Sequence, residues 1–285
     1  LRPSQVRAWK GLSSQRAGLV LGPPGTGKTY ALSWMALGYL LACQSAARPC
    51  RILVTAFTLN AIGNLLDALQ EKVARYAPGQ AVLAYMGNQP AAGLAPEIAH
   101  LPMRGRGWAE RIWEALGTEQ IVVGSSVWGL SKLLARDQVS GYPASGDGRT
   151  APVFDLVCID EASQMVLSNG LMALAGLVEG GRVLVAGDNK QLPPVRQVRE
   201  QEVGGRLLGG SLYDFMKSAD IAELALDETF RLCAPLTAFP EKKFYPGRYR
   251  PADDVADNRL SLNADWRAGL EPWEHRVLDP EAPVA

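Results

Sequence analysis

The chain of 285 residues has few of the residues that build metal centres and disulfide frameworks. It contains four cysteines, none of them in a C-x-x-C pair, and two histidines, His100 and His275. The absence of a clustered Cys/His set argues against a structural zinc site and fits a reduced setting. We therefore expect a cytoplasmic protein, or a nuclear one in a eukaryote.

The chain also lacks net charge and long apolar runs. Its formal net charge is zero, so bulk charge does not indicate a polyanionic partner. Residues 1–120 nevertheless carry 12 Lys and Arg against 6 acidic residues, which favours a basic face there, although an ordinary solvated surface explains the same count. The longest apolar stretch, 31–43, is shorter than the ~20 residues of a membrane span and predicts a buried helix. The sequence begins at Leu1 and shows no signal peptide, so we expect a piece of a larger multidomain chain without a membrane anchor.

Short β-branched segments alternate with helical patterns. The expected strands are 19–21, 52–55, 81–85, 121–124, 156–160 and 183–186. The expected helices are 3–12, 27–41, 60–76, 107–116, 127–135 and 171–178. This alternation predicts an α/β fold with a doubly wound, mostly parallel sheet, whose ligands bind beyond the carboxyl ends of the strands.

A glycine-rich segment, 22–29, follows directly on an apolar run and satisfies the pattern G-x-x-x-x-G-K-[ST]. It consists of Gly22, Pro23, Pro24, Gly25, Thr26, Gly27, Lys28 and Thr29. Its glycines let backbone N–H groups face an anion, Lys28 can reach the β- and γ-phosphates, and the Thr29 hydroxyl can ligate Mg²⁺. The sequence therefore predicts a site for ATP with Mg²⁺, and we include the adjoining Tyr30 among the nucleotide-contacting candidates.

Residues 153–159 form a mostly apolar run, and the acids Asp160 and Glu161 follow it directly. We expect Asp160 to hold Mg²⁺ together with Thr29, and Glu161 to orient and deprotonate the attacking water. A surface turn is the alternative for two such acids taken alone. The sequence Ala-Ser-Gln that follows them fits water activation better than a phosphoryl acceptor, which disfavours a P-loop kinase.

A further strand, 183–186, leads into a loop stiffened by Pro193 and Pro194. Gln191 lies on this loop, where its amide can sense a γ-phosphate and report it to the residues that the loop contacts. A plain turn is the alternative explanation of the same residues.

Polar residues cluster where expected strands meet helix starts. Candidate contacts to a nucleic-acid strand are Thr55, Phe57, Thr58, Asn60, Asn64, Ser125, Ser126 and Pro193. Hydroxyl and amide groups beside helix N-termini suit phosphate contacts that read no sequence. Phe57 can stack on a base or be a core aromatic, and Ser125 and Ser126 can also cap the helix that follows them.

The order of these motifs resembles the motor core of superfamily-one helicases, in the branch of the nonsense-mediated-decay RNA helicases and the nuclease-helicases of DNA replication. The resemblance rests on segments 22–29, 160–164, 187–194 and 226–232, and it covers about residues 3–250. It implies a RecA-like P-loop NTPase fold.

The resemblance also implies roles for single residues. Gln5 is similar to the family's adenine-reading glutamine, and Phe230 occupies a position beside the adenine where the family often has Tyr. Arg231 would contact the γ-phosphate across an interdomain cleft. Segments 54–66 and 123–126 resemble two strand-contacting motifs.

We expect residues 1–218 to form a first RecA-like motor domain with a small insertion at about 87–120, and residues 219–285 to be the incomplete beginning of a second one. The expected function is that of an ATP-dependent helicase or translocase on single-stranded DNA or RNA. The alternative is a nucleotide-gated clamp or regulatory module that does not unwind. Since part of the charge stabilisation would belong to the rest of the second domain, we expect these 285 residues alone to hydrolyse ATP weakly.

Overall fold

The computed structural model describes residues 1–91, 93–135, 153–195, 201–204, 206–258 and 269–277. The chain divides into two compact units. Unit 1 comprises Leu1–Leu21 and Lys28–Leu224, and unit 2 comprises Gly22–Gly27 and Ala225–Ala285. The glycine-rich turn therefore packs with the later part of the chain, whereas Lys28 and Thr29, which follow it, belong to unit 1.

An eight-stranded sheet forms the centre of unit 1, in the order β10-β1-β7-β6-β2-β5-β3-β4. The strands are β1 (Ala17–Leu21), β2 (Cys50–Ala56), β3 (Val82–Gly87), β4 (Ala99–Pro102), β5 (Gln120–Ser125), β6 (Phe154–Asp160), β7 (Leu177–Gly187) and β10 (Glu223–Ala225). From β1 through β4 in this order, all neighbouring strands pair in parallel. Parallel strands buried on both faces read as nearly continuous apolar runs, which is why their sequences were recognisable.

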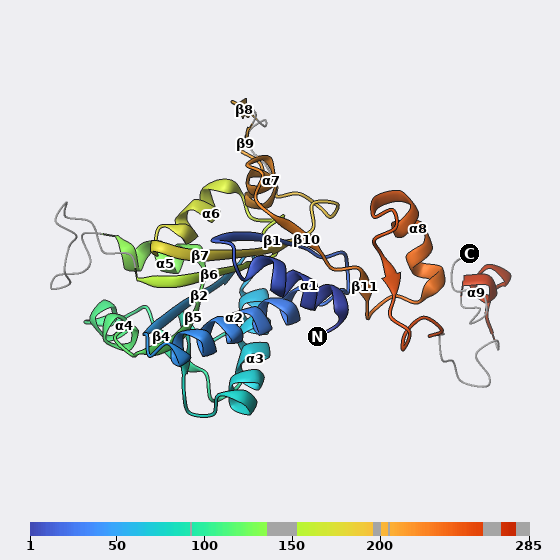
Figure 1. Cartoon of the computed structure of the whole chain (residues 1–285). Coiled ribbons are helices and arrows are strands. Elements are labelled where there is room, and N and C mark those ends of the chain that lie inside the picture. Colours follow the sequence, from blue (N-terminus) through green and yellow to red (C-terminus); the bar gives the residue numbers. More distant parts are fainter. Residues whose placement is uncertain (92, 136–152, 196–200, 205, 259–268, 278–285) are drawn as a thin grey trace. The chain divides into compact units, whose positions relative to one another are not determined.

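Helices cover both faces of this sheet. They are α1 (Pro3–Leu12), α2 (Lys28–Ser45), α3 (Leu59–Tyr76), α4 (Trp108–Leu116), α5 (Val127–Leu134), α6 (Leu167–Leu174) and α7 (Leu212–Ser218). Figure 1 shows α2 and α3 on one face and α6 and α7 on the other. The predicted α/β class with a doubly wound, mostly parallel sheet is thus confirmed, and its core consists of fully buried aliphatic side chains such as Leu19, Ile52, Leu53, Val122 and Val157.

Local signals explain where several helices begin. Pro3 occupies the first turn of α1, where the N–H group that proline lacks has no helical partner. The side chains of Thr58 and Ser126 accept hydrogen bonds from the backbone N–H groups of Ala61 and Gly129, at 3.2 and 3.1 Å, and so cap α3 and α5. The helix-capping role expected for Ser126 is confirmed, whereas the Ser125 hydroxyl donates to the Met86 carbonyl instead.

The structure differs from the predicted elements in three places. The segment expected as an insertion supplies, besides the predicted helix α4, the strand β4, which was not predicted and forms an edge of the main sheet. Helix α6 begins four residues before the predicted 171–178 and ends before Leu177, because Leu177 and Val178 open the long strand β7. Strand β10 extends the sheet of unit 1 beyond residue 218, where we placed the end of the first domain; the Leu19 N–H donates to the Ala222 carbonyl at 2.8 Å.

Within its described residues, unit 2 contains a pair of two-residue parallel strands and two helices. They are β11 (Glu228–Thr229), β12 (Arg250–Pro251), α8 (Ala234–Phe244) and α9 (Pro272–Val277). A short antiparallel pair, β8 (Gln201–Val203) and β9 (Arg206–Leu208), precedes α7 in unit 1. That unit 2 opens a second RecA-like domain remains a prediction.

Candidate nucleotide site and sheet edge

Thr29 and Asp160 lie side by side at the carboxyl end of β6. Thr29 is the second residue of α2, and its hydroxyl donates a hydrogen bond of 2.5 Å to Asp160 Oδ2. Burial raises the pKa of the Asp160 carboxyl, while the Thr29 hydrogen bond, the Glu161 N–H and the Lys28 charge act in the opposite direction. A hydroxyl and a carboxylate in contact, with a lysine close enough to affect the acid, fit the pair of oxygen ligands that Mg²⁺ takes beside a triphosphate.

Glu161 has an unusual backbone conformation. Its φ is +52°, in the left-handed region that residues with a Cβ rarely adopt. Its N–H donates to Asp160 Oδ1 at 2.8 Å, and its Oε2 accepts a hydrogen bond from the Thr58 hydroxyl at 3.3 Å. Burial, followed by the Asp160 charge, raises the pKa of Glu161. A half-buried carboxyl with a raised pKa is better suited to accept a proton than a fully solvated one.

A chain of hydrogen bonds connects the end of β6 with the loop after β7. Ser163 Oγ accepts the Asp188 N–H at 3.2 Å, and the Gln191 side-chain amide donates to Asp188 Oδ2 at 2.7 Å. The backbone adds a contact from the Ala162 N–H to the Ala186 carbonyl at 2.9 Å. Gln191 is therefore held on a loop bonded to the acid-bearing segment, which is the arrangement that its predicted sensing role requires.

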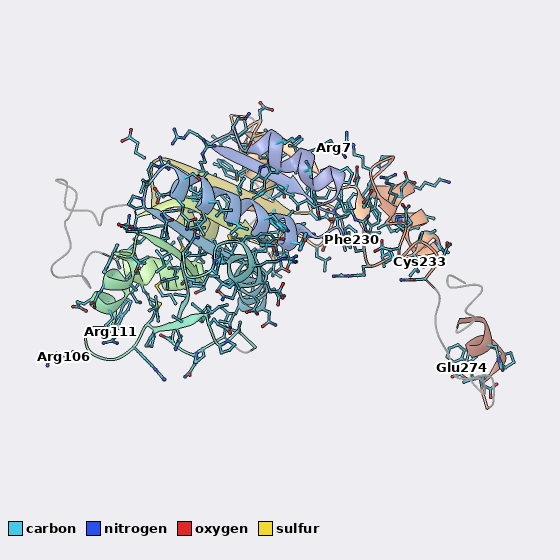
Figure 2. The ribbon with its side chains drawn as sticks, turned by 60° about the horizontal axis from the view of Figure 1, so that its bottom comes forward. Arg7, Arg106, Arg111, Phe230, Cys233 and Glu274 are labelled. Atoms are coloured by element: carbon cyan, nitrogen blue, oxygen red, sulfur yellow. The ribbon has the colours of Figure 1, made fainter. Side chains whose placement is uncertain are left out.

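In unit 2, the glycine-rich turn contacts the segment around Thr229. The Phe230 N–H donates to the Gly25 carbonyl at 2.9 Å, and Figure 2 labels Phe230 in this segment. A Cβ added to Gly25 would lie 2.5 Å from Thr229 Oγ1 and 2.6 Å from the Arg231 Cβ, and the φ of Gly25 is +77°. Only glycine fits there, and Phe230 and Arg231, selected from the sequence as nucleotide contacts, lie against the predicted phosphate turn.

Two further nucleotide candidates, Gln5 and Tyr30, contact other residues of the protein. Gln5 is buried in α1, and its Oε1 accepts the Arg2 N–H at 3.0 Å, so it stabilises the first turn of its own helix. Tyr30 is partly exposed, and Lys72 Nζ lies 4.4 Å from the centre of its ring. An adenine contact by either residue remains a prediction.

Most of the candidate contacts to a nucleic-acid strand lie at the carboxyl ends of β2 and β5, where some of them are buried and others are exposed. Thr55 and Ser125 are buried, and the Thr55 hydroxyl has no hydrogen-bond partner among the described residues. Phe57 has 50% of its surface exposed, which excludes the alternative of a core aromatic. Thr58, Asn60 and Asn64 are exposed, and Ser126 is partly so. The exposed members can contact a polymer directly, whereas in this conformation Thr55 and Ser125 support the edge from inside.

Two exposed apolar features were not selected from the sequence. Trp128, in the first turn of α5, is 63% exposed. On the loop after β7, Leu192 and Val195 are 82% and 93% exposed, next to the exposed candidate Pro193. An exposed tryptophan one residue after a capped helix start has no packing role that explains it. A sequence signal for Trp128 is its place two residues after Ser126.

The described part of the chain has neither a metal-ligand cluster nor a membrane-spanning helix. No group of three or more His, Cys, Asp or Glu residues there is arranged to hold a metal ion. This does not conflict with a magnesium site of one hydroxyl and one carboxylate, because Mg²⁺ keeps most of its ligands as water and phosphate oxygens. No described helix is long and apolar enough to cross a lipid bilayer.

These features define an α/β protein in which a glycine-rich turn of the phosphate-loop pattern follows β1, two acids follow one another at the carboxyl end of β6, and polar residues lie at the carboxyl ends of β2 and β5. Residues 5–197 match the family described as AAA domain, and the chain belongs to this family.

Three relatives extend the match along the chain. It is 27% identical over 280 residues to "DNA replication ATP-dependent helicase/nuclease JHS1" of Arabidopsis thaliana, covering 96% of this chain and 18% of that protein. It is 25% identical over 299 residues to "DNA replication ATP-dependent helicase/nuclease DNA2" of Homo sapiens, covering 99% and 25%. It is 27% identical over 293 residues to "Regulator of nonsense transcripts 1 homolog" of Arabidopsis thaliana, covering 95% and 22%.

These relatives confirm the predicted resemblance to the superfamily-one helicase core and, with the parallel sheet, its RecA-like fold class. The chain spans a quarter or less of the length of the relatives named here.

Proposed function

We propose that this chain is the motor part of an ATP-dependent helicase or translocase that moves on single-stranded DNA or RNA. The observation that carries the proposal is the contact between Thr29, which ends the phosphate-loop signature, and Asp160, which is followed directly by the strained Glu161. A P-loop whose last hydroxyl contacts the acid at the end of another strand of the same sheet is an arrangement that suits nucleoside triphosphate hydrolysis.

Each residue of the site has a task in hydrolysis. Lys28 offsets the negative charge of the transferred phosphoryl group, and Glu161 orients a water molecule and accepts its proton. Mg²⁺, when bound through Thr29 and Asp160, would neutralise charge on the β- and γ-phosphates. Arg231 would add positive charge near the γ-phosphate. The left-handed conformation of Glu161 directs its carboxyl differently from an extended residue at the same strand end, which explains why the protein retains the strain there.

The exposed edge formed by the ends of β2 and β5 is the proposed binding surface for the strand. Its amides and hydroxyls suit phosphates, and Phe57 offers a stacking face for a base. Two connections lead from the hydrolytic acids to neighbouring loops: Thr58 contacts Glu161 directly, and Gln191 connects through Asp188. A change at the γ-phosphate could therefore alter the edge, as motor action requires.

The names of the relatives support this assignment. Two of them are named as ATP-dependent helicase/nucleases of DNA replication, and one as a regulator of nonsense transcripts. We propose that the chain acts as part of a larger protein on nucleic acid in the cytoplasm, or in the nucleus of a eukaryote.

Nucleotide binding and strand-stimulated hydrolysis test the proposal. The chain should bind ATP in the presence of Mg²⁺, and Lys28→Ala should abolish binding, whereas Lys10→Ala, in the last turn of α1, should not. Matched single-stranded DNA and RNA oligomers should each be tested for stimulation of ATP hydrolysis, and a tailed duplex for strand displacement. Stimulation without displacement would support a translocase or clamp, and a chain that binds no ATP would contradict the proposal.

A further inference from the structure

Two hydroxyl groups of unit 2 converge on one carbonyl of the glycine-rich turn. The Thr229 hydroxyl donates to the Pro24 carbonyl at 3.0 Å, and the Tyr249 hydroxyl donates to the same oxygen at 2.7 Å. The adjacent Gly25 carbonyl accepts the Phe230 N–H at 2.9 Å. Both donor side chains are buried, at 0% exposure for Thr229 and 3% for Tyr249.

The fold of unit 2 places these donors together. Strands β11 and β12 pair in parallel with Thr229 opposite Pro251, and Tyr249 directly precedes β12. The Tyr249 ring packs on Tyr245 with 5.4 Å between ring centres, so its hydroxyl is delivered by a ring with little freedom. The Thr229 hydroxyl also accepts the Arg231 N–H at 3.3 Å and thereby orients the backbone of the residue expected to reach the γ-phosphate.

The peptide between Pro24 and Gly25 matters because this turn is poor in donors. Pro23 and Pro24 have no N–H, and the Thr26 N–H donates to the Pro23 carbonyl at 3.3 Å. A trans peptide is planar, so its N–H points opposite to its carbonyl. When the two hydroxyls fix the direction of the Pro24 carbonyl, they also fix the direction of the Gly25 N–H, one of the few amides in the turn that can face a phosphate.

We propose that Thr229 and Tyr249 are positioning residues that hold the phosphate-binding turn in its anion-accepting conformation through the Pro24 carbonyl. The inference rests on the proposed ATP site and deepens it. The contacts of Thr229 and Tyr249 with the turn and the affinity of the turn for phosphate would then be thermodynamically linked, independently of any contact made by Arg231.

The test uses substitutions that remove one hydroxyl and little else. Tyr249→Phe and Thr229→Val should each weaken ATP binding about threefold to tenfold, the range for losing one neutral hydrogen bond. Thr229→Ser keeps the hydroxyl and should retain the affinity. The matched control is Tyr213→Phe, which removes a buried tyrosine hydroxyl bonded to Glu223 in unit 1 at 2.9 Å and should leave ATP affinity unchanged.

Competition with a fluorescent nucleotide, using ATP, ADP and adenosine, separates positioning from a general structural role. Positioning predicts that the loss is largest for ATP and absent for adenosine, because only phosphates face the turn. An equal loss for all three ligands would overturn the inference, as would unchanged ATP affinity in both hydroxyl-removing variants while Lys28→Ala abolishes binding. Failure of the unsubstituted chain to bind ATP would overturn this inference and the proposed function together.

Discussion

The carboxyl ends of β6 and β2 are neighbours in one parallel sheet, with Asp160 opposite Ala56, yet they present different surfaces. Strand β6 ends in a buried acid followed by Glu161 with a positive φ. Strand β2 ends in a half-exposed ring, Phe57, and a helix cap, Thr58. The end of β6 is buried and is followed by a residue in the left-handed region, whereas the end of β2 is followed by an exposed ring and a cap residue with extended backbone.

Under the proposed function, one end of the sheet would serve two ligands, the nucleotide and the nucleic-acid strand. The route of the chain after each strand decides what its end presents. After β2 the chain enters α3 through a residue with extended backbone, which leaves Phe57 facing outward. After β6 the chain turns sharply and is tied to β7 through Ala162 and Ser163. Beyond the pairing of the two strands, a side-chain hydrogen bond from Thr58 to Glu161 connects the residues that follow them.

The largest effect should come from removing the acid at the end of β6. Glu161→Gln keeps the shape but cannot accept the proton of water, so we expect strand-stimulated kcat to fall about 10²-fold to 10⁴-fold. ATP and strand affinities should remain close to those of the unsubstituted chain. Steady-state ATPase assays test this, with Asp155→Asn as the control: Asp155 lies near the opposite end of the same strand and accepts the Arg51 N–H at 2.8 Å. Unchanged kcat in Glu161→Gln would remove this acid from the chemistry.

A smaller effect, on nucleic-acid binding, should come from the exposed aromatic residue that follows β2. Phe57→Ala should weaken binding of a single-stranded oligomer about tenfold, since stacking of one base contributes about 1–3 kcal/mol, without changing ATP affinity in the absence of the strand. Trp128→Ala should act in the same direction. Fluorescence anisotropy of a labelled oligomer measures both. Tyr76→Ala, at the far end of α3, is the matched control for loss of an exposed aromatic side chain. If Phe57→Ala and the unsubstituted chain bind the oligomer with equal affinity, the end of β2 does not belong to the surface that binds nucleic acid.

The smallest effects should be on the free energy of unfolding, with opposite signs for substitutions after β6 and after β2. Glu161→Gly relieves a left-handed residue and should raise the free energy of unfolding by up to about 1 kcal/mol, although it removes the proposed general base. Thr58→Ala removes a helix cap and should lower that free energy by about 1 kcal/mol, whereas Thr58→Ser should not. Urea denaturation compares them. Destabilisation by Glu161→Gly as large as that by Thr58→Ala would show that the φ of Glu161 stores no strain.

Elements with strong local signals were predictable from the sequence. Helix α1 has the predicted bounds, because Pro3 begins it and an apolar stripe continues to Leu12. The central strands were found because each is an apolar run between turns. Strand β4 and helix α7 were not expected, since four residues at a sheet edge or seven residues after a serine cap carry little periodicity. Leu177 and Val178 fit a helix or a strand equally well by sequence, and pairing with β6 decides for the strand.

The candidate site also has features that the sequence predicted and features that it did not. The phosphate loop and the acid pair were recognisable because their chemistry requires fixed spacing along the chain. The sequence did not show which candidate contacts to a nucleic-acid strand are exposed. Residues as close as Thr55 and Phe57 differ in exposure because of the path that the chain takes after β2. The contacts of Thr229 and Tyr249 with Pro24 join residues more than 200 positions apart, and no local pattern announces them.

The amino-acid sequence alone determined the class of fold, the phosphate loop and the identity of its acids, because local hydrophobic periodicity and short-range glycine and proline geometry are properties of neighbouring residues. The tertiary structure alone decided that Asp160 meets Thr29, that Glu161 adopts a left-handed backbone, that Phe57 is exposed while Thr55 is buried, and that two hydroxyls hold the Pro24 carbonyl. These features depend on which distant segments pack together, and packing is a property of the whole chain.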